Sequence, residues 1–399
     1  MNAIVVLSIV CAYIVCFVQA IGPLGTFGVG VGSSKCEPSI TTASGTYAMH
    51  KASGQYCSGD LIFEDTFDIF DTRKWQHENT LSGDGKWEFQ WYTNNRSNSF
   101  CEEGYLHIRP TLTSDVYGET FLSSGVVNLH GGSDADQCTN PSFYGCERTG
   151  SVPLIINPVR SAKIRTQDSF SFKYGKVEIS AKMPAGDWLF PAIWFLPKDN
   201  AYGSWPSSGE IDLVLSRGNR NFTNAEKHIG IEQITSSLHF GPFTSLDLYQ
   251  SALFVRNAKP GNGFNNEFHR YQMEWTADKI VFSVDDVETG AIKAGTGFWS
   301  RGLFDSIAPG VMNPWRLSTT NMAPFDQEFY LIMNLAVGGS QHFPDDASNA
   351  INKPWTNESP TAAADFWNAR NAWLPTWNLD QNLSRDASLI VDYVRVWAL

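Results

Sequence analysis

SWPSSGEIDLVLSRGN, residues 204–219, places two carboxylates, Glu210 and Asp212, two positions apart in an apolar run after a Pro/Ser/Gly turn. Successive side chains of a strand point to opposite faces, so these two acids share one face and the apolar residues between them share the other. Paired carboxylates on an open sheet face beside an aromatic side chain, here Trp205, are typical of sites that cleave glycosidic bonds. The alternative is a solvated strand face. The stretch predicts a strand that lines either a sugar cleft or plain surface.

Short apolar runs separated by Gly, Pro, Asn and Asp fill the chain from Leu61 onward. Each run has the length of a strand, many alternate, and β-branched or aromatic residues dominate them. Helical periodicity is nearly absent, and only residues 360–374 favour a short helix. The runs at 61–68 and 388–397 can pair and so close a single domain. With no repeat and no crossover helices, the pattern predicts one antiparallel all-β sandwich.

Composition restricts the possible partners. The chain has 399 residues, of which 42% are hydrophobic, so a large core is available and global disorder is excluded. Its net charge is −12 and it has no long basic run. Nucleic acids and anionic membrane surfaces are therefore poor partners, whereas a neutral polymer remains suitable.

The N-terminal segment, residues 1–20, is apolar and ends in the small-residue pattern Val18-Gln19-Ala20. This pattern predicts a cleaved signal peptide and a secreted protein, while an uncleaved signal anchor is the alternative. No later segment is long and apolar enough to span a bilayer. We expect a leader over residues 21–60 that its cysteines hold in place, and the sandwich over residues 61–399. Four sequons agree with secretion, at Asn95, Asn221, Asn357 and Asn382.

Signal cleavage would leave five cysteines, which a secreted chain tends to oxidise. Cys138 and Cys146 bracket a short Pro/Gly loop, which favours a disulfide between them. Cys36 and Cys57 flank a Ser/Thr-rich segment and form the second predicted pair. Cys101 is left over, either as a buried free thiol or as an intermolecular link.

Further motifs accompany the carboxylate stretch in a fixed order. They are CEPSITTASGTYA (36–48), CSGDLIFEDTFD (57–68), FQWYTNNRSNSF (89–100), DQCTNPSFYGCERT (136–149), SAKIRTQDSFSFKYGKVEISAKMPAGDWLFPAIWFLP (161–197), SSLHFGP (236–242), YQMEWTADKIVFSVDD (271–286), FYLIMNLAVGG (329–339) and DYVRVW (392–397). From about Cys36 to the C-terminus, these motifs resemble the family 16 glycoside hydrolases. Within that family, the chain resembles the invertebrate β-1,3-glucan-binding proteins, also called Gram-negative-bacteria-binding proteins.

The resemblance implies a concanavalin A-like jelly roll, in which two curved antiparallel sheets form a concave glucan cleft. It also implies that Glu210 stands at the nucleophile position and Asp212 at the assisting carboxylate. The substrate-binding residues that it implies are Trp205, Asn94, Asn95, Arg96, His239 and Phe240. Asn-Asn is also ordinary turn chemistry, and Trp188 and Trp194 suit either the core or the cleft.

The acid/base residue is missing from the motif. Hydrolytic relatives carry Glu-x-Asp-x-x-Glu, and the last position here is Leu215. Strict alternation would turn Leu215 to the opposite face, so this register needs a bulge. A sister pattern without the bulge uses the fourth residue, here Val214. Neither register supplies a carboxyl group, and the loss of a general acid typically costs about 10²–10⁴-fold in rate.

The sequence therefore predicts a secreted β-1,3-glucan-binding protein of innate immunity, in which catalysis is lost. Other microbial polysaccharides, lipopolysaccharide and an immune-cascade protease are the further partners expected. An active or weakly active endo-1,3-β-glucanase is the alternative, and a storage glycoprotein with an inert cleft is a third hypothesis. We expect no cofactor and no metal. A calcium site shared by Glu64 and Asp392 would have too few oxygen ligands.

Overall fold

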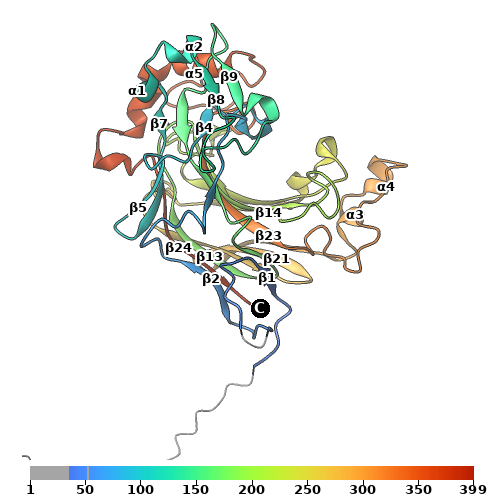
Figure 1. The fold of residues 1–399 in the computed structure, drawn as a ribbon. Helices are drawn as coiled ribbons and strands as arrows, with labels where there is room; N and C mark the ends of the chain where they lie inside the picture. The colour runs from blue at the N-terminus through green and yellow to red at the C-terminus, as the bar shows by residue number, and fades with distance from the viewer. Residues whose placement is uncertain (1–35, 52–53) are drawn as a thin grey trace, which may run out of the picture. The chain divides into compact units, whose positions relative to one another are not determined.

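The computed structural model describes residues 36–51 and 54–399 (Figure 1). The predicted signal peptide lies outside these residues, as do residues 21–35 and 52–53 of the predicted leader. Within the described residues, no helix has both the length and the apolar character needed to cross a bilayer.

Two large antiparallel sheets form the body of the unit that spans residues 37–399. The nine-stranded sheet follows the order β1 (Thr42–Ser44), β12 (Ser171–Lys173), β23 (Phe329–Val337), β14 (Leu189–Pro197), β15 (Glu210–Ser216), β18 (Gln233–His239) and β19 (Leu253–Asn257), with β11 (Lys163–Arg165) and β3 (Gln76–His77) beside β23. The eight-stranded sheet follows the order β22 (Val287–Lys293), β21 (Lys279–Val284), β20 (His269–Trp275), β13 (Gly175–Lys182), β24 (Leu389–Trp397), β6 (Tyr105–Ile108) and β5 (Ser99–Glu102), with β2 (Leu61–Asp65) on β24.

The hydrophobic core lies between the two sheets. In β20, Tyr271, Met273 and Trp275 are buried and their neighbours are more exposed, which is the alternation of a strand with one core face. Trp275 packs edge-on against Phe172 and Phe329 of the other sheet. Burial of such apolar surface stabilises the packing of the two sheets by about 25 cal/mol per Å². The outer face of the nine-stranded sheet takes no part in this packing and is available for a site.

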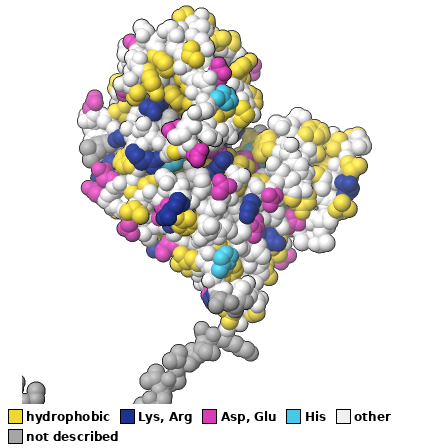
Figure 2. All heavy atoms as spheres, in the orientation of Figure 1, with side chains coloured by type: hydrophobic (Ala, Val, Ile, Leu, Met, Phe, Trp, Pro, Cys, Tyr) yellow, Lys and Arg dark blue, Asp and Glu magenta, His cyan; other side chains and the backbone are white. Residues whose placement is uncertain are grey.

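Smaller elements flank the nine-stranded sheet (Figure 1). One group comprises β4 (Gln90–Tyr92), β7 (Thr111–Leu112), β8 (Val126–Asn128), β9 (Glu147–Thr149), β10 (Val159–Ser161), α1 (Ser114–Tyr117), α2 (Phe121–Ser124), α5 (Ala362–Asn368) and α6 (Arg370–Trp373). The other comprises α3 (Phe298–Arg301) and α4 (Phe304–Ile307), which follow β22. Short elements complete the described chain: β16 (Thr223–Asn224), β17 (Lys227–His228), η1 (Gly83–Gly85), η2 (Ser142–Tyr144), η3 (Thr244–Leu246), η4 (Tyr249–Ala252), η5 (Leu374–Trp377) and η6 (Asn382–Ser384). The surface is hollowed between these two groups (Figure 2).

The structure confirms the predicted all-β antiparallel sandwich and two of its details. β2 pairs antiparallel with β24, which joins the early and late runs of the chain. The predicted helix at 360–374 is present as α5 and α6, which meet at Ala369. Residues 37–60, assigned to the leader, belong to the same compact unit as the sandwich, because β1 pairs with β12 and Tyr56 is buried in the core.

The cysteines follow the predicted pattern. Cys138 and Cys146 form a disulfide with an S–S distance of 1.97 Å. Cys36 and Cys57 are each disulfide-bonded. Cys101 is the free cysteine of the described chain and is half-buried. Burial raises the pKa of its thiol to about 12, so the sulfur stays protonated and unreactive at neutral pH.

Candidate functional site

A β-bulge in β15 decides which residue stands beside the two carboxylates. Along β18, Asp212 pairs with Ser237 and Leu215 pairs with Thr235, so three steps on β15 match two on β18. β14 repeats the mismatch on the other side of β15, where Asp212 lies opposite Trp194 and Leu215 lies opposite Ala192. The extra residue therefore sits between Asp212 and Leu215.

The bulge brings Leu215 to the carboxylate face. Cross-strand partners share a face, and Ala192 and Trp194 are two residues apart on one strand, so Leu215 and Asp212 point the same way. Val214 faces the opposite side and is fully buried in the core. Of the two registers open from the sequence, the structure adopts the bulged one, and the half-buried Leu215 shares the face of Asp212.

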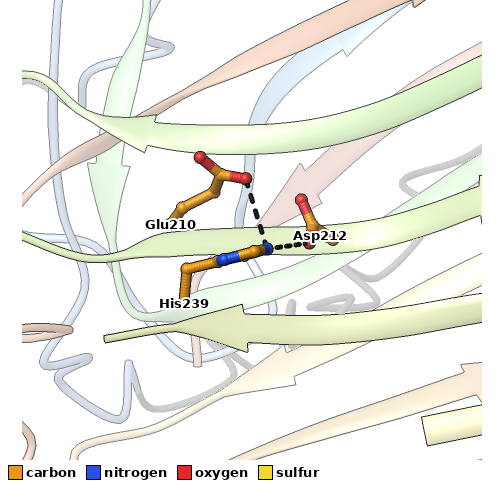
Figure 3. A group of neighbouring side chains, drawn as sticks. All are labelled: Glu210, Asp212 and His239. Atoms are coloured by element: carbon orange, nitrogen blue, oxygen red, sulfur yellow. Dashed lines mark hydrogen bonds and ion pairs between the residues drawn. The ribbon is translucent and has the colours of Figure 1, made fainter. Parts of the chain in front are cut away.

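Glu210, Asp212 and His239 meet on this face (Figure 3). Glu210 and His239 lie opposite each other on β15 and β18, and the imidazole Nε2 is 3.6 Å from Glu210 Oε1. The same Nε2 lies 3.1 Å from Asp212 Oδ2, which also accepts a hydrogen bond from the Ser237 hydroxyl. The exposed Trp205 donates its indole N–H to Glu210 Oε2 at 2.9 Å. One imidazole therefore bridges both carboxylates, and Trp205 covers Glu210 from the solvent side.

His239 carries the positive charge of this cluster. Its Nδ1 lies 2.6 Å from Asp247 Oδ2, so each ring nitrogen faces a carboxylate. Burial opposes the charged form of the ring, but Glu210 and Asp212 outweigh burial and raise the pKa of His239 to about 11. The ring also stacks on Tyr249, with centroids 4.8 Å apart. His239 is therefore an imidazolium at neutral pH.

The two carboxyl groups respond differently to the same surroundings. Burial raises the pKa of Glu210 to about 7, against the opposing charge of His239. Burial acts on Asp212 in the same direction, but its closer contact with His239 and the Ser237 hydroxyl bring its pKa below the usual value. Glu210 is thus poised between its acid and carboxylate forms near neutrality, and Asp212 stays ionised.

Glu210, Asp212 and His239 form the one cluster within the described chain that could hold a cation, because their ligand atoms lie within 4.8 Å of one another. A metal would need the neutral imidazole, and the proton on His239 competes for the same position. The imidazolium supplies one positive charge among the carboxyl groups of Glu210, Asp212 and Asp247.

A second charged group lies next to the carboxylates on the same sheet. Lys163 on β11 pairs with Asn334 of β23, and its ammonium lies 4.8 Å above the Trp194 ring. That ammonium is also 3.3 Å from Glu78 and 3.2 Å from Asp84. The Trp194 indole N–H donates to Asn334 Oδ1 at 2.7 Å. These contacts hold the Trp194 ring in a fixed position, where it is half-buried against the core.

The structure corrects the predicted role of Phe240. Its ring has 0% exposure and packs edge-on against Phe298 and Phe304, with Trp315 next to it. The strand alternation that turns His239 outward turns Phe240 into the core, so its ring is not available for stacking on sugar. Trp188 is likewise a core residue with 0% exposure.

The Asn94–Arg96 loop lies at the far edge of the sheet, next to β3. Asn94 donates to the Ala135 carbonyl, and Asn95 accepts from the Ser97 amide. The Arg96 guanidinium donates to His77 Nε2 at 3.0 Å. The polar contacts of this loop are thus with its own surroundings, and the structure does not bring it against Glu210.

Several residues of the site were not found from the sequence. Asp247 and Tyr249 lie in one segment, Lys86 and Lys163 lie in two others, and no spacing rule connects them to β15. Ser237 could have been found, because it stands two residues before His239 on one strand and therefore shares its face. The charges of Glu210 and Glu88 raise the pKa of Lys86 against the effect of burial, which places its ammonium within electrostatic reach of Glu210.

The chain is an antiparallel all-β sandwich with a carboxylate-bearing sheet face, and part of it matches a family of glycoside hydrolases. The family model described as Glycosyl hydrolases family 16 matches residues 135–300. Two solved structures share the fold at low identity. They are the laminarinase from Rhodothermus marinus (TM-score 0.50, 23% identity, 85% of this chain and 97% of that chain) and the endo-β-1,3-glucanase from Pyrococcus furiosus (TM-score 0.51, 20% identity, 88% and 98%).

Curated relatives narrow the class further. The β-1,3-glucan-binding protein of Penaeus monodon is 48% identical over 342 residues, which is 85% of this chain and 90% of that protein. β-1,3-Glucan-binding protein 1 of Manduca sexta is 34% identical over 92% of this chain and 69% of its own length. Gram-negative bacteria-binding protein 1 of Drosophila melanogaster is 31% identical, with the same shares covered. The chain belongs to the β-1,3-glucan-binding protein family.

Proposed function

We propose that this chain binds β-1,3-glucan in the cleft above β14, β15 and β18 and does not hydrolyse it. The observation that carries the proposal is that the bulge of β15 turns Leu215, a residue without a carboxyl group, to the face of Asp212. Retaining hydrolysis needs a nucleophile and a proton donor about 5–5.5 Å apart. Glu210 remains for the role of nucleophile, and a leucine side chain has no acidic proton to give to the leaving oxygen.

The geometry around Glu210 supports binding without turnover. Trp205 keeps an exposed ring with its indole edge held against Glu210, which suits stacking on a pyranose ring. Asp247 is the other carboxylate on His239, but it lies behind the imidazole and also accepts from the Phe240 amide. It therefore cannot replace the lost acid on the sugar side.

The names of the relatives support the wider role. Proteins named for β-1,3-glucan and for Gram-negative bacteria share most of this chain. We infer a secreted pattern-recognition protein of innate immunity that binds microbial polysaccharide or lipopolysaccharide and activates a protease cascade. The apolar N-terminal segment and the oxidised cysteines agree with secretion.

One preparation tests binding and turnover together. The purified protein is mixed with insoluble β-1,3-glucan for co-sedimentation, and reducing ends released from soluble laminarin are measured in parallel. We expect retention on the glucan with no release of reducing ends. Release that Glu210→Gln abolishes would instead establish a glucanase, and failure to sediment with glucan would favour the inert storage glycoprotein.

A further inference from the structure

A large pocket lies outside the carboxylate face. Its volume is about 920 Å³, within the range of about 300–1,000 Å³ typical of ligand sites. Three segments wall it, at residues 81–89, 144–157 and 340–364, and none of its lining residues belongs to β14, β15 or β18. The pocket is thus a separate feature of the group that contains β4, β8, β9 and α5.

Two aromatic side chains stand out at the pocket. Trp87 is 49% exposed and Tyr144 is 74% exposed, whereas most aromatic residues of this chain are buried. Both have a left-handed backbone, with φ of 53° and 60°. A bulky residue in this region costs on the order of 1–3 kcal/mol, so the fold maintains strain to present these rings.

Contacts restrain the Trp87 ring and the backbone that carries Tyr144. The Trp87 ring packs edge-on against Phe143, with centroids 5.6 Å apart. Tyr144 lies inside the loop that the Cys138–Cys146 disulfide closes. A rigid platform loses little conformational entropy on binding, which favours recognition of a ligand that offers only weak individual contacts.

The polar lining indicates an uncharged, hydroxyl-rich ligand. Glu88, Glu147 and Glu358 contribute carboxyl groups, which accept hydrogen bonds from hydroxyls. Arg148 is the one Lys or Arg among the lining residues described, and its guanidinium already donates to the Asn157 side chain and the Phe143 carbonyl. No free cation is therefore offered to a phosphate or sulfate, and carboxyl groups set among apolar lining residues suit a hydroxyl-rich ligand better than an acyl chain.

We propose that this pocket is a second carbohydrate-binding site, which takes a short neutral oligosaccharide stacked on Trp87 and Tyr144. It adjoins the cleft through one short segment. Lys86 lies within the electrostatic reach of Glu210, and the next two residues, Trp87 and Glu88, line the pocket. Two glycan sites on one chain would allow simultaneous contact with a polysaccharide surface and raise avidity without a second subunit.

The test isolates the pocket from the cleft. In a Trp205→Ala background, titration calorimetry measures binding of three neutral probes: laminarihexaose, cellohexaose and maltohexaose. We expect saturable binding of at least one probe, weakened at least about tenfold by Trp87→Ala with Tyr144→Ala. Phe268→Ala, an exposed aromatic residue of the described chain that does not line the pocket, is the matched control and should leave binding unchanged.

Each other outcome overturns the proposal. The proposal fails if none of the three probes binds saturably. It also fails if a probe binds equally well to a folded variant with Trp87→Ala and Tyr144→Ala. Binding of the acyl probe cis-parinaric acid that these substitutions abolish, without sugar binding, would assign an apolar ligand instead. Glucan co-sedimentation of a Trp87→Ala, Tyr144→Ala variant, in which the cleft is unchanged, reports on the cleft alone, so failure of the cleft function and failure of this site are distinguishable.

Discussion

Restoring a carboxyl group at position 215 should restore hydrolysis. The bulge points Leu215 to the side of Asp212, and its cross-strand neighbours, Ala192 and Thr235, are small. Leu215→Glu therefore places a carboxyl group on the glucan side without crowding. A positioned general acid contributes about 10²–10⁴-fold, which is roughly 3–5 kcal/mol of barrier. We expect release of reducing ends from laminarin to rise by that factor over the unmodified protein.

The pH profile gives the expectation a second signature. The nucleophile must be ionised, and burial raises the pKa of Glu210 to about 7. The introduced carboxyl group must instead be protonated, so activity should follow a bell with its lower limb set by Glu210. When the introduced carboxyl group ionises, its negative charge would raise the pKa of Glu210 further.

Two variants serve as controls for this experiment. Leu215→Gln introduces a side chain of the same shape as the glutamate of Leu215→Glu but without its titrating proton. The Leu215→Gln variant should therefore stay inactive. Val214→Glu directs its carboxyl group into the core, and should lower stability without any gain in activity. A folded Leu215→Glu variant with no activity between about pH 5 and about pH 8 would show that more than the acid has been lost, and would refute the assignment of this position.

Further predictions concern charge, affinity and stability. The folded pKa of His239, about 11, exceeds its unfolded value, so the stabilisation that His239 contributes is complete below about pH 6.5 and is lost as pH rises toward 11. The Tm of the unmodified protein should therefore exceed that of His239→Gln by a margin that shrinks over this interval. A margin that stays constant would contradict the prediction. Trp205→Ala should weaken glucan binding about tenfold, or about 1.4 kcal/mol, in a co-sedimentation isotherm. Phe240→Ala should leave that affinity unchanged but cost about 3–5 kcal/mol of unfolding free energy in urea titration, and the reverse result would return Phe240 to the cleft. Cys138→Ser with Cys146→Ser should lower the unfolding free energy by about 2–3 kcal/mol, because the disulfide closes a short loop, and an unchanged urea midpoint would argue against this stabilisation.

The carboxylate stretch shows how far sequence reasoning reaches. Alternation placed Glu210 and Asp212 on one face, and the structure agrees. Alternation left Leu215 and Val214 as rival positions, because a bulge depends on pairing with two neighbouring strands that come from other parts of the chain. Phe240 was assigned to the cleft by resemblance, whereas the alternation from His239 already pointed it inward.

The sequence by itself determined the β class, the order of the strand-like runs, the Cys138–Cys146 closure and the absence of a carboxyl group in either register. These follow from local periodicity and from residue identity, which neighbours in space do not alter. Only the tertiary structure decided that Leu215 stands beside Asp212, that His239 is held between carboxylates from distant segments, and that Trp87 and Tyr144 share a pocket. The burial of a side chain and the charges around it depend on which segments pack together, and these segments are far apart in the sequence.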